Sequence, residues 1–215
     1  MTKSKTVVSL SLILILGGYI LYNQFFSSEV ITIKHRNVTN NPAEKVTLEE
    51  GISTVGVDLK VGFYDVKNIS KETVIVNGNV LKMGDQLINQ IYYNRSEITI
   101  EGKGKVLFSP SKFSILTPNK KGEIEIESTS EYVVGTDLPV GDYSITASQI
   151  DSSKNGIYVQ ILTSFNISNE LVDSIQFNSS NEKVKVHLKQ GELVQIIKDS
   201  FNNEPNDSKL IIVKD

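Results

Sequence analysis

The sequence predicts an all-β fold, with two related small β-sandwich or barrel-like domains behind one N-terminal transmembrane helix. Three observations support this prediction. A long uncharged stretch opens the chain, a twelve-residue segment occurs twice, and many short runs alternate apolar and polar residues. Apolar residues make up 39% of the 215 residues, which is enough to build a packed core rather than a disordered chain.

The transmembrane helix is predicted within residues 1–28. No charged residue occurs from Thr6 to Ser28, and this uncharged length can cross a hydrocarbon core about 30 Å thick. Lys3 and Lys5 precede the stretch, which predicts a short cytoplasmic N-terminus and an extracellular C-terminal part. We therefore expect an uncleaved, single-pass signal anchor in the cell membrane. A cleaved signal peptide and a buried core helix are the alternatives, although no Ala-x-Ala site ends the stretch.

The rest of the chain divides at polar segments. Residues 29–43 are predicted to be a stalk or linker, because they are polar and contain Asn40, Asn41 and Pro42. A first β module is predicted at 44–118 and a second at 122–215. A polar segment between them ends in a glycine.

The repeated segment is the most informative feature of the sequence. Residues 55–66 read VGVDLKVGFYDV and residues 134–145 read VGTDLPVGDYSI, with seven identities in twelve positions. Both copies predict a tight turn, because glycine adopts positive φ at low cost, followed by a strand with one buried face. Asp58 and Asp137 stand where Asx side chains accept hydrogen bonds from backbone amides.

The ends of the two copies also match in type. ITIEGKGKVLF at 98–108 and VKVHLKQGELV at 184–194 each predict a strand, a glycine turn and a second strand. A polar loop and a last apolar run follow in each copy, at 113–116 and at 210–213. The segment 102–105 (GKGK) is therefore predicted to be a hairpin turn and not a phosphate-binding loop.

Short strands elsewhere complete the prediction, together with one short helix at residues 168–174 that Ser168 would cap. The expected strands are 30–34, 73–76, 97–101, 105–108, 123–127, 156–162, 174–178, 183–188 and 193–198.

The repeated motif resembles the short all-β modules found in exported and cell-surface proteins of Gram-positive bacteria. Their marker has the form V-G-x-D-[IL]-P-x-G-x-Y. The second copy matches it through Gly135, Asp137, Pro139, Gly141 and Tyr143, whereas the first has Lys in place of the proline. The resemblance implies a β fold and a location outside the cell, and it assigns no activity because most of these modules have no known function.

Composition excludes several classes of protein. The chain has no cysteine and no tryptophan, which excludes disulfides, thiol catalysis and cysteine-ligated zinc. Its net charge is −3 and it has no cluster of Lys and Arg, so we expect no nucleic-acid partner. The two histidines, His35 and His187, are far apart, and His187 is predicted on an exposed strand face. No catalytic, cofactor-binding or metal-binding residue is predicted, and no cofactor is implied.

One group of acidic residues leaves two interpretations open. Glu123, Glu125 and Glu127 alternate with isoleucines, which places three carboxylates on one face of a strand. They could hold a hard cation such as Ca²⁺, or they could form a solvated face that discourages edge aggregation.

The expected function is that of a membrane-anchored extracellular protein without enzymatic activity. It would bind an envelope protein or a cell-wall glycan through its duplicated module, or act as a spacer. Two alternatives from other classes stay open: a hydrolase of envelope polymers that uses paired carboxylates, and an accessory subunit of a secretion or transport complex.

Overall fold

The computed structural model describes Arg36 and residues 40–165, 169–201 and 204–215. These residues form an all-β structure, which confirms the predicted fold class. The predicted anchor at residues 1–28 lies outside the described residues. Within the described ranges, no helix is long and apolar enough to cross a membrane.

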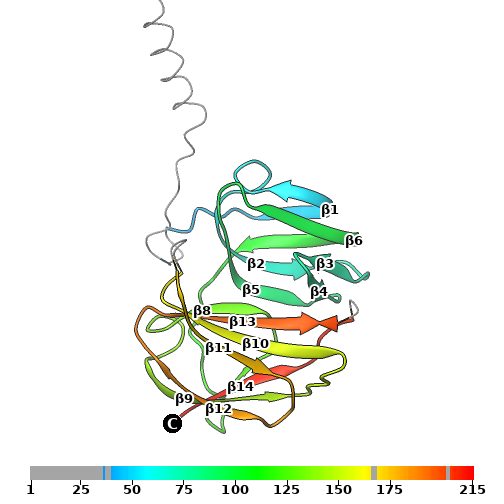
Figure 1. Ribbon diagram of the computed structural model, residues 1–215. Coiled ribbons are helices and arrows are strands. Elements are labelled where there is room, and N and C mark those ends of the chain that lie inside the picture. The colour runs from blue at the N-terminus through cyan, green and yellow to red at the C-terminus, as the bar shows by residue number, and fades with distance from the viewer. Residues whose placement is uncertain (1–35, 37–39, 166–168, 202–203) are drawn as a thin grey trace, which may run out of the picture. The chain divides into compact units, whose positions relative to one another are not determined.

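The N-terminal half of the described chain runs to about residue 113 and contains six strands (Figure 1). They are β1 (Val46–Thr54), β2 (Gly62–Asn68), β3 (Val74–Val76), β4 (Asn79–Leu81), β5 (Gln86–Tyr92) and β6 (Glu97–Pro110). β6 pairs with β1 along most of its length, with β2 near its C-terminal end and with β3 near its middle. β5 joins β2 and β4 joins β3, which gives the strand orders β5-β2-β6-β1 and β4-β3-β6-β1.

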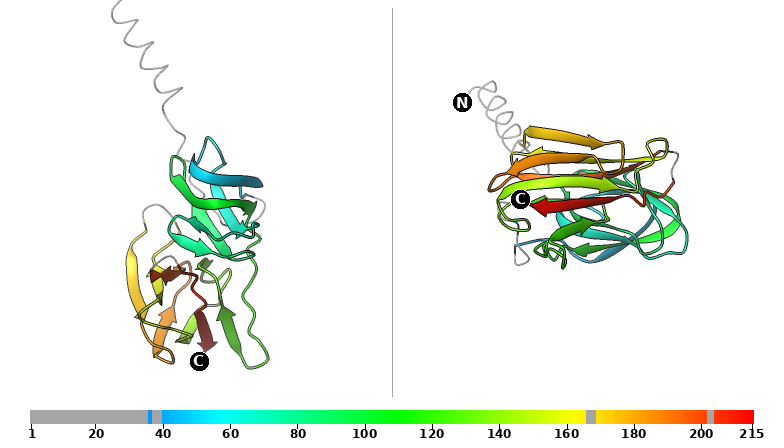
Figure 2. Two further views of the ribbon diagram at one scale, coloured as in Figure 1. Left: turned by 90° about the vertical axis from the view of Figure 1, so that its right-hand side faces the viewer. Right: turned by 90° about the horizontal axis from the view of Figure 1, so that it is seen from below.

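The C-terminal half contains eight strands, seen from two further directions in Figure 2. They are β7 (Glu123–Ile126), β8 (Ser130–Val133), β9 (Gly141–Ser148), β10 (Asn155–Leu162), β11 (Leu171–Phe177), β12 (Lys183–Leu188), β13 (Leu193–Ser200) and β14 (Lys209–Lys214). Their orders are β12-β9-β14-β7 and β11-β10-β13-β8. These two strand orders correspond to β5-β2-β6-β1 and β4-β3-β6-β1 in the N-terminal half.

The pairing therefore relates the two halves strand by strand. β2, β3, β4 and β5 correspond to β9, β10, β11 and β12. The long strand β1 corresponds to β7 plus β8, and the long strand β6 corresponds to β13 plus β14. Continuous strands in the first half are thus interrupted in the second, and the repeat extends well beyond the twelve-residue motif.

This correspondence corrects two expectations from the sequence. Residues 102–105 are not a hairpin turn, because β6 continues through them. A side chain on Gly102 would lie 2.9 Å from the carbonyl oxygen of Thr73, so glycine allows β3 to approach β6 closely. Segment 98–108 also does not match 184–194. It matches β13 and β14, and the apolar run at 113–116 is not a strand.

The repeated motif has the same conformation in both copies. Gly56 has φ 91° and Gly135 has φ 87°, as the predicted turn requires. The amide of Gly56 donates to the carbonyl oxygen of Leu59 at 2.7 Å, and the amide of Gly135 donates to that of Leu138 at the same distance. The same hydrogen-bonded turn therefore occurs once in each copy of the motif.

Polar side chains tie each motif to its surroundings, as the sequence predicted for the aspartates. A carboxylate oxygen of Asp58 accepts a hydrogen bond from the amide of Thr54 at 2.7 Å, and Asp137 accepts one from Val133 at 2.8 Å. The hydroxyl of Tyr143 donates to the carbonyl oxygen of Pro139 at 2.6 Å. Tyr64 makes the same bond to residue 60, so the lysine that replaces proline there preserves the contact.

Each half has its own hydrophobic core. In the N-terminal half, the fully buried rings of Tyr64 and Phe108 meet edge to face with centroids 6.0 Å apart. In the C-terminal half, Tyr143, Ile145 and Ile212 belong to a cluster that takes residues from all eight strands. The alternating strands therefore bury one face each, because apolar burial is the main favourable term in folding.

The predicted helix near residue 168 is wrong within the described residues. β11 begins at Leu171 and pairs antiparallel with β10. The apolar spacing of Leu171, Val172 and Ile175 suggested a helical face, yet only Ile175 points into the core while the other two are exposed. Pairing with β10 thus decides the conformation, overriding a weak local pattern.

The described part of the predicted stalk lies against the β structure. Asn41 donates from its side-chain amide to the carbonyl oxygen of Phe63 at 2.8 Å and accepts from the amide of Phe63 at 3.0 Å. Ala43 is buried in the N-terminal core. These residues extend the structure by a short segment before β1.

Candidate functional site

A junction between the two halves positions the candidate site. β5 and β8 form one parallel bridge, Ile88 to Ser130, where the amide of Ile88 donates to the carbonyl oxygen of Thr129 at 2.9 Å. Asn89 has φ 57° and bulges out of β5, and its side-chain amide donates to the carbonyl oxygen of Glu131 at 3.2 Å. The bulge brings β5 close enough to join the sheets of both halves.

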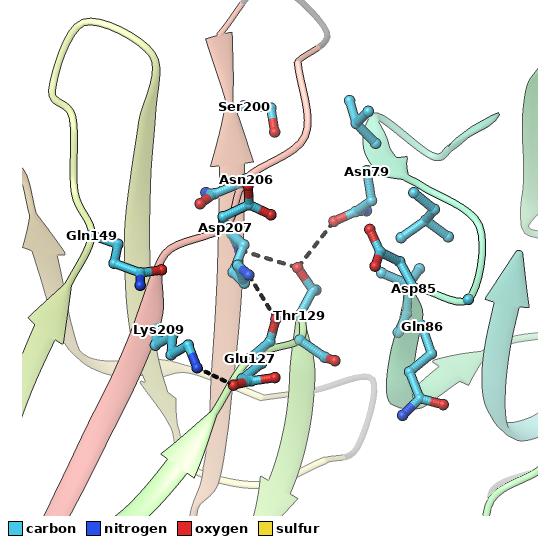
Figure 3. A pocket seen from close by; sticks show the side chains of 16 residues that line it. Asn79, Asp85, Gln86, Glu127, Thr129, Gln149, Ser200, Asn206, Asp207 and Lys209 are labelled. Carbon is cyan, nitrogen blue, oxygen red and sulfur yellow. Dashed lines mark hydrogen bonds and ion pairs between the residues drawn. The ribbon is translucent and has the colours of Figure 1, made fainter. Parts of the chain in front are cut away.

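A polar cavity of about 380 Å³ lies beside this junction (Figure 3). Its walls are β4, the β4–β5 turn, the segment between β7 and β8, and the ends of β13 and β14. Thr129 links two of these walls. Its hydroxyl donates to the side-chain oxygen of Asn79 at 3.2 Å and accepts from the amide of Lys198 at 3.1 Å.

Two of the three carboxylates that line the cavity, those of Glu127 and Asp207, form ion pairs. Glu127 forms an ion pair with Lys209, and the ammonium of Lys198 donates to the carbonyl oxygen of Glu127 at 2.6 Å. Asp207 pairs with Lys82 at 2.8 Å. The cavity therefore carries both signs of charge and no strong excess of either.

The protonation of two of these groups follows from their partners. The hydrogen bond and the charge of Lys209 lower the pKa of Glu127. Burial lowers the pKa of Lys198, although Asp85, Asp207 and Glu127 oppose that effect. A carboxyl group that acts as a general acid needs a raised pKa, so Glu127 is unsuited to that role.

Uncharged amides supply the remaining polar groups of the cavity. Gln86 and Gln149 line the cavity, are exposed, and make no side-chain hydrogen bond within the described part of the chain. Each amide offers two N–H donors and one oxygen acceptor. Together with the paired charges, they can bind a ligand that presents several hydroxyl or amide groups.

A second polar feature is a buried cluster of charges. The guanidinium of Arg36 pairs with the carboxylate of Asp137 and donates to the carbonyl oxygen of Glu131 at 2.8 Å. Its carbon lies 5.3 Å from the ring centre of Phe63 and 4.7 Å from that of Phe113. Arg36 therefore contacts rings from the N-terminal half and acids from the C-terminal half.

Glu131 completes the buried cluster. Burial raises its pKa from 4.5 to about 7, against a lowering by a hydrogen bond from Gln195 and by the charge of Arg36. Gln195 donates to one carboxylate oxygen of Glu131 at 2.9 Å. One guanidinium thus faces two acids, and protonation of Glu131 would leave the cluster neutral.

The pKa of Glu131 predicts how stability depends on pH. Because the folded state holds the proton more tightly, Glu131 contributes stability that is complete below pH 4.5 and is lost as the pH rises through about 7. The contribution amounts to about 3 kcal/mol. The Glu131→Gln variant should lose this dependence, measured as the urea midpoint of the full-length chain between pH 5 and pH 8. The exposed Glu44→Gln variant is the control, and an unchanged pH profile in Glu131→Gln would contradict the prediction.

The three glutamates left open by the sequence do lie on an exposed strand face. Glu125 and Glu127 are exposed and Glu123 is half-buried, while the isoleucines between them are buried. The side-chain amide of Asn119 donates to Glu123 at 3.3 Å and to Glu125 at 3.1 Å. Among the described residues, no group of three or more His, Asp or Glu side chains is arranged to hold a metal ion.

His187 is exposed as predicted, but it has a partner that the sequence did not reveal. Its Nδ1 lies 2.7 Å from a carboxylate oxygen of Asp142, which is directly opposite on β9. Both side chains are more than half exposed. A histidine oriented by a carboxylate is one part of a catalytic triad, but such a pair on an open sheet is more simply a surface contact.

The chain matches no protein-family model, and no curated protein matches it either.

Proposed function

We propose that this protein is a membrane-anchored extracellular binding protein without enzymatic activity. In this proposal two related β-sandwich or barrel-like domains follow one N-terminal transmembrane helix. The polar cavity beside the β5–β8 junction is the observation that carries the binding role, since both halves contribute its walls. The resemblance of the repeated motif to modules of Gram-positive surface proteins supports the extracellular location.

The lining of the cavity favours a hydroxyl-rich ligand, such as a fragment of a cell-wall glycan. Its volume of about 380 Å³ falls in the range of small-ligand sites. Among the described residues, unbonded donors and acceptors come from Gln86 and Gln149, and Glu127, Lys209 and Asp207 add charges to the same lining. An apolar ligand would leave these groups without partners, which is costly.

A binding measurement on the full-length chain in detergent tests this role. Titration with soluble cell-wall glycan fragments should give saturable binding. The double variant Gln86→Ala/Gln149→Ala should bind roughly tenfold or more weakly, because each lost hydrogen bond is worth about 1 kcal/mol. Gln176→Ala on β11 is the matched control and should bind as the parent chain does.

One outcome would contradict the binding role, and another would contradict the cavity as the binding site. Absence of saturable binding would favour a spacer. Equal weakening by the Gln176→Ala control would place the glycan elsewhere on the surface.

A hydrolase that uses paired carboxylates is the second candidate, because Asp85, Glu127 and Asp207 line one cavity. Such an enzyme needs one carboxyl group with a raised pKa, whereas Lys209 lowers the pKa of Glu127. We therefore expect no new reducing ends when glycan fragments are incubated with the chain. Release of reducing ends that Glu127→Gln abolishes would replace the binding role by the hydrolytic one.

The membrane anchor has its own test. Protease added to intact cells should degrade the chain from about residue 29 onward, and the N-terminus should stay in the membrane fraction. Release of the C-terminal part into the medium without protease would indicate a cleaved signal peptide instead.

A further inference from the structure

One sheet of the C-terminal half has two open edges. Among the described residues, β12 pairs only with β9, and β7 at the other end of that sheet pairs only with β14. An open edge exposes backbone groups that can pair with another strand. β12 and β7 are antiparallel to each other, because three antiparallel pairings separate them.

The two open edges carry opposite charges. The basic row on β12 and the acidic row along β7 each occupy the exposed face of their strand: Lys183, Lys185 and His187 on β12, and Glu123, Glu125 and Glu127 along β7. Within the sheet, Lys185 pairs with Asp215 at 3.0 Å and yet keeps 76% of its side chain exposed.

The backbone of the basic row faces the open edge. Asp215 donates its amide to the carbonyl oxygen of Asp142 at 3.0 Å, so Asp142 on β9 bonds toward β14. Hydrogen bonds alternate sides along an antiparallel strand, so Tyr143 bonds toward β12, through its partner Val186. The N–H and C=O groups of Lys185, next to Val186, therefore point away from β9.

The same alternation applies to the acidic row. Because Asp215 bonds toward β9, Ile212 bonds toward β7 through its partner Ile124. The backbone groups of Glu123 and Glu125 then point to the open edge. Asn119 already bonds both backbone groups of Glu123. Its backbone amide donates to the carbonyl oxygen of Glu123 at 2.8 Å, and its side-chain oxygen accepts from the amide of Glu123 at 3.1 Å. Glu125 is left as the centre of the open edge.

From these observations we propose that a second copy of this chain pairs edge to edge with the first. β12 of one copy continues the sheet beyond β7 of the next, antiparallel, with Lys185 hydrogen-bonded opposite Glu125. This register also brings the side chains of His187 and Lys183 toward those of Glu123 and Glu127, although Asn119 and Lys198 already bond the backbone of these two glutamates. Opposite charges on directly facing residues stabilise such a pair.

The interface joins two different surfaces, and each copy keeps one edge free. Such head-to-tail contacts form open chains of copies unless the rotation between copies closes a ring. This association adds to the proposed ligand binding, on which it rests. It would place many cavities side by side, and several of them could then bind one polymer with higher avidity.

Cysteine crosslinking in the full-length chain tests the pairing, since the protein has no cysteine of its own. The variants Glu125→Cys and Lys185→Cys are mixed in detergent and treated with a short bifunctional thiol reagent. We expect roughly tenfold more crosslinked dimer from the mixture than from either variant alone, and its loss at 1 M salt as charges are screened. The control mixes Lys185→Cys with Val57→Cys, a residue that is 80% exposed on the β1–β2 turn of the N-terminal half.

Charge reversal supplies a second readout by sedimentation of chains without cysteine. Lys185→Glu should stay monomeric, and the double variant Lys185→Glu/Glu125→Lys should associate again. Crosslinking no greater than in the Val57 control would overturn the proposal. Lys185→Glu chains that associate like the parent would overturn it as well.

Discussion

Replacing Arg36 with leucine is expected to lower the free energy of unfolding by about 3–5 kcal/mol. Arg36 is the only described cation in contact with the buried carboxylate of Asp137, and the side chains of both are almost fully buried. Removing the guanidinium leaves Asp137 and the neighbouring Glu131 without a balancing charge. It also removes the contacts that the guanidinium makes with the rings of Phe63 and Phe113.

Urea unfolding of the full-length chain in detergent measures the loss. Lys60→Leu is the control, because the ion pair of Lys60 with Glu44 is exposed and should contribute at most about 1 kcal/mol. The double variant Arg36→Leu/Asp137→Asn should recover part of the loss, since it leaves one buried charge fewer. A loss in Arg36→Leu no larger than in Lys60→Leu would show that the buried pair does not join the two halves.

The strand pattern could be predicted where burial alternates. β12 alternates exposed and buried residues, and β9 buries Tyr143, Ile145 and Ala147 at every second position; both strands were expected from period-2 patterns. β8 buries all four of its residues, so it shows no alternation, and β5 loses the pattern at the bulge of Asn89. Neither strand was expected, because β8 has no exposed face and the bulge in β5 shifts its buried positions by one residue.

The two copies of the repeat have the same residues only at positions where the fold requires a particular residue type. Gly56 and Gly135 need positive φ, and Asp58 and Asp137 cap a turn, so these positions match. Elsewhere the strands need only apolar side chains facing the core, which many sequences supply. A glycine pair inside β6 was therefore mistaken for a turn, although it permits close approach of another strand.

The candidate site could not be predicted because distant segments build it. Arg36 came from a predicted stalk, and no pattern in the sequence singled out Glu131. Their shared burial depends on how the halves meet, through β5 and β8. The cavity has the same origin, since Asn79 and Thr129 belong to different halves. Only the exposed face of Glu125 and Glu127 followed from the sequence alone.

The equivalence of the two halves leads to the second large expected effect. Phe108 on β6 and Ile212 on β14 hold the same place, because Phe108 pairs with β2 and Ile212 pairs with the equivalent strand β9. Both side chains are buried, and Phe108 also meets the ring of Tyr92 with centroids 5.8 Å apart. Phe108→Ala should cost about 3–5 kcal/mol and Ile212→Ala about 2–5 kcal/mol through lost contacts and the cavities left behind.

Hydrogen exchange, read by mass spectrometry on the full-length chain, should show where each loss falls. Phe108→Ala should speed exchange chiefly in residues 46–110, and Ile212→Ala chiefly in 123–214, because each half has a core of its own. Ile115→Ala, at a residue 66% exposed, is the control and should change stability by no more than about 0.5 kcal/mol. Equal acceleration in both halves by either core variant would mean that the β5–β8 junction binds them into one cooperative unit. The predicted division at about residue 118 would then describe a repeat within one domain.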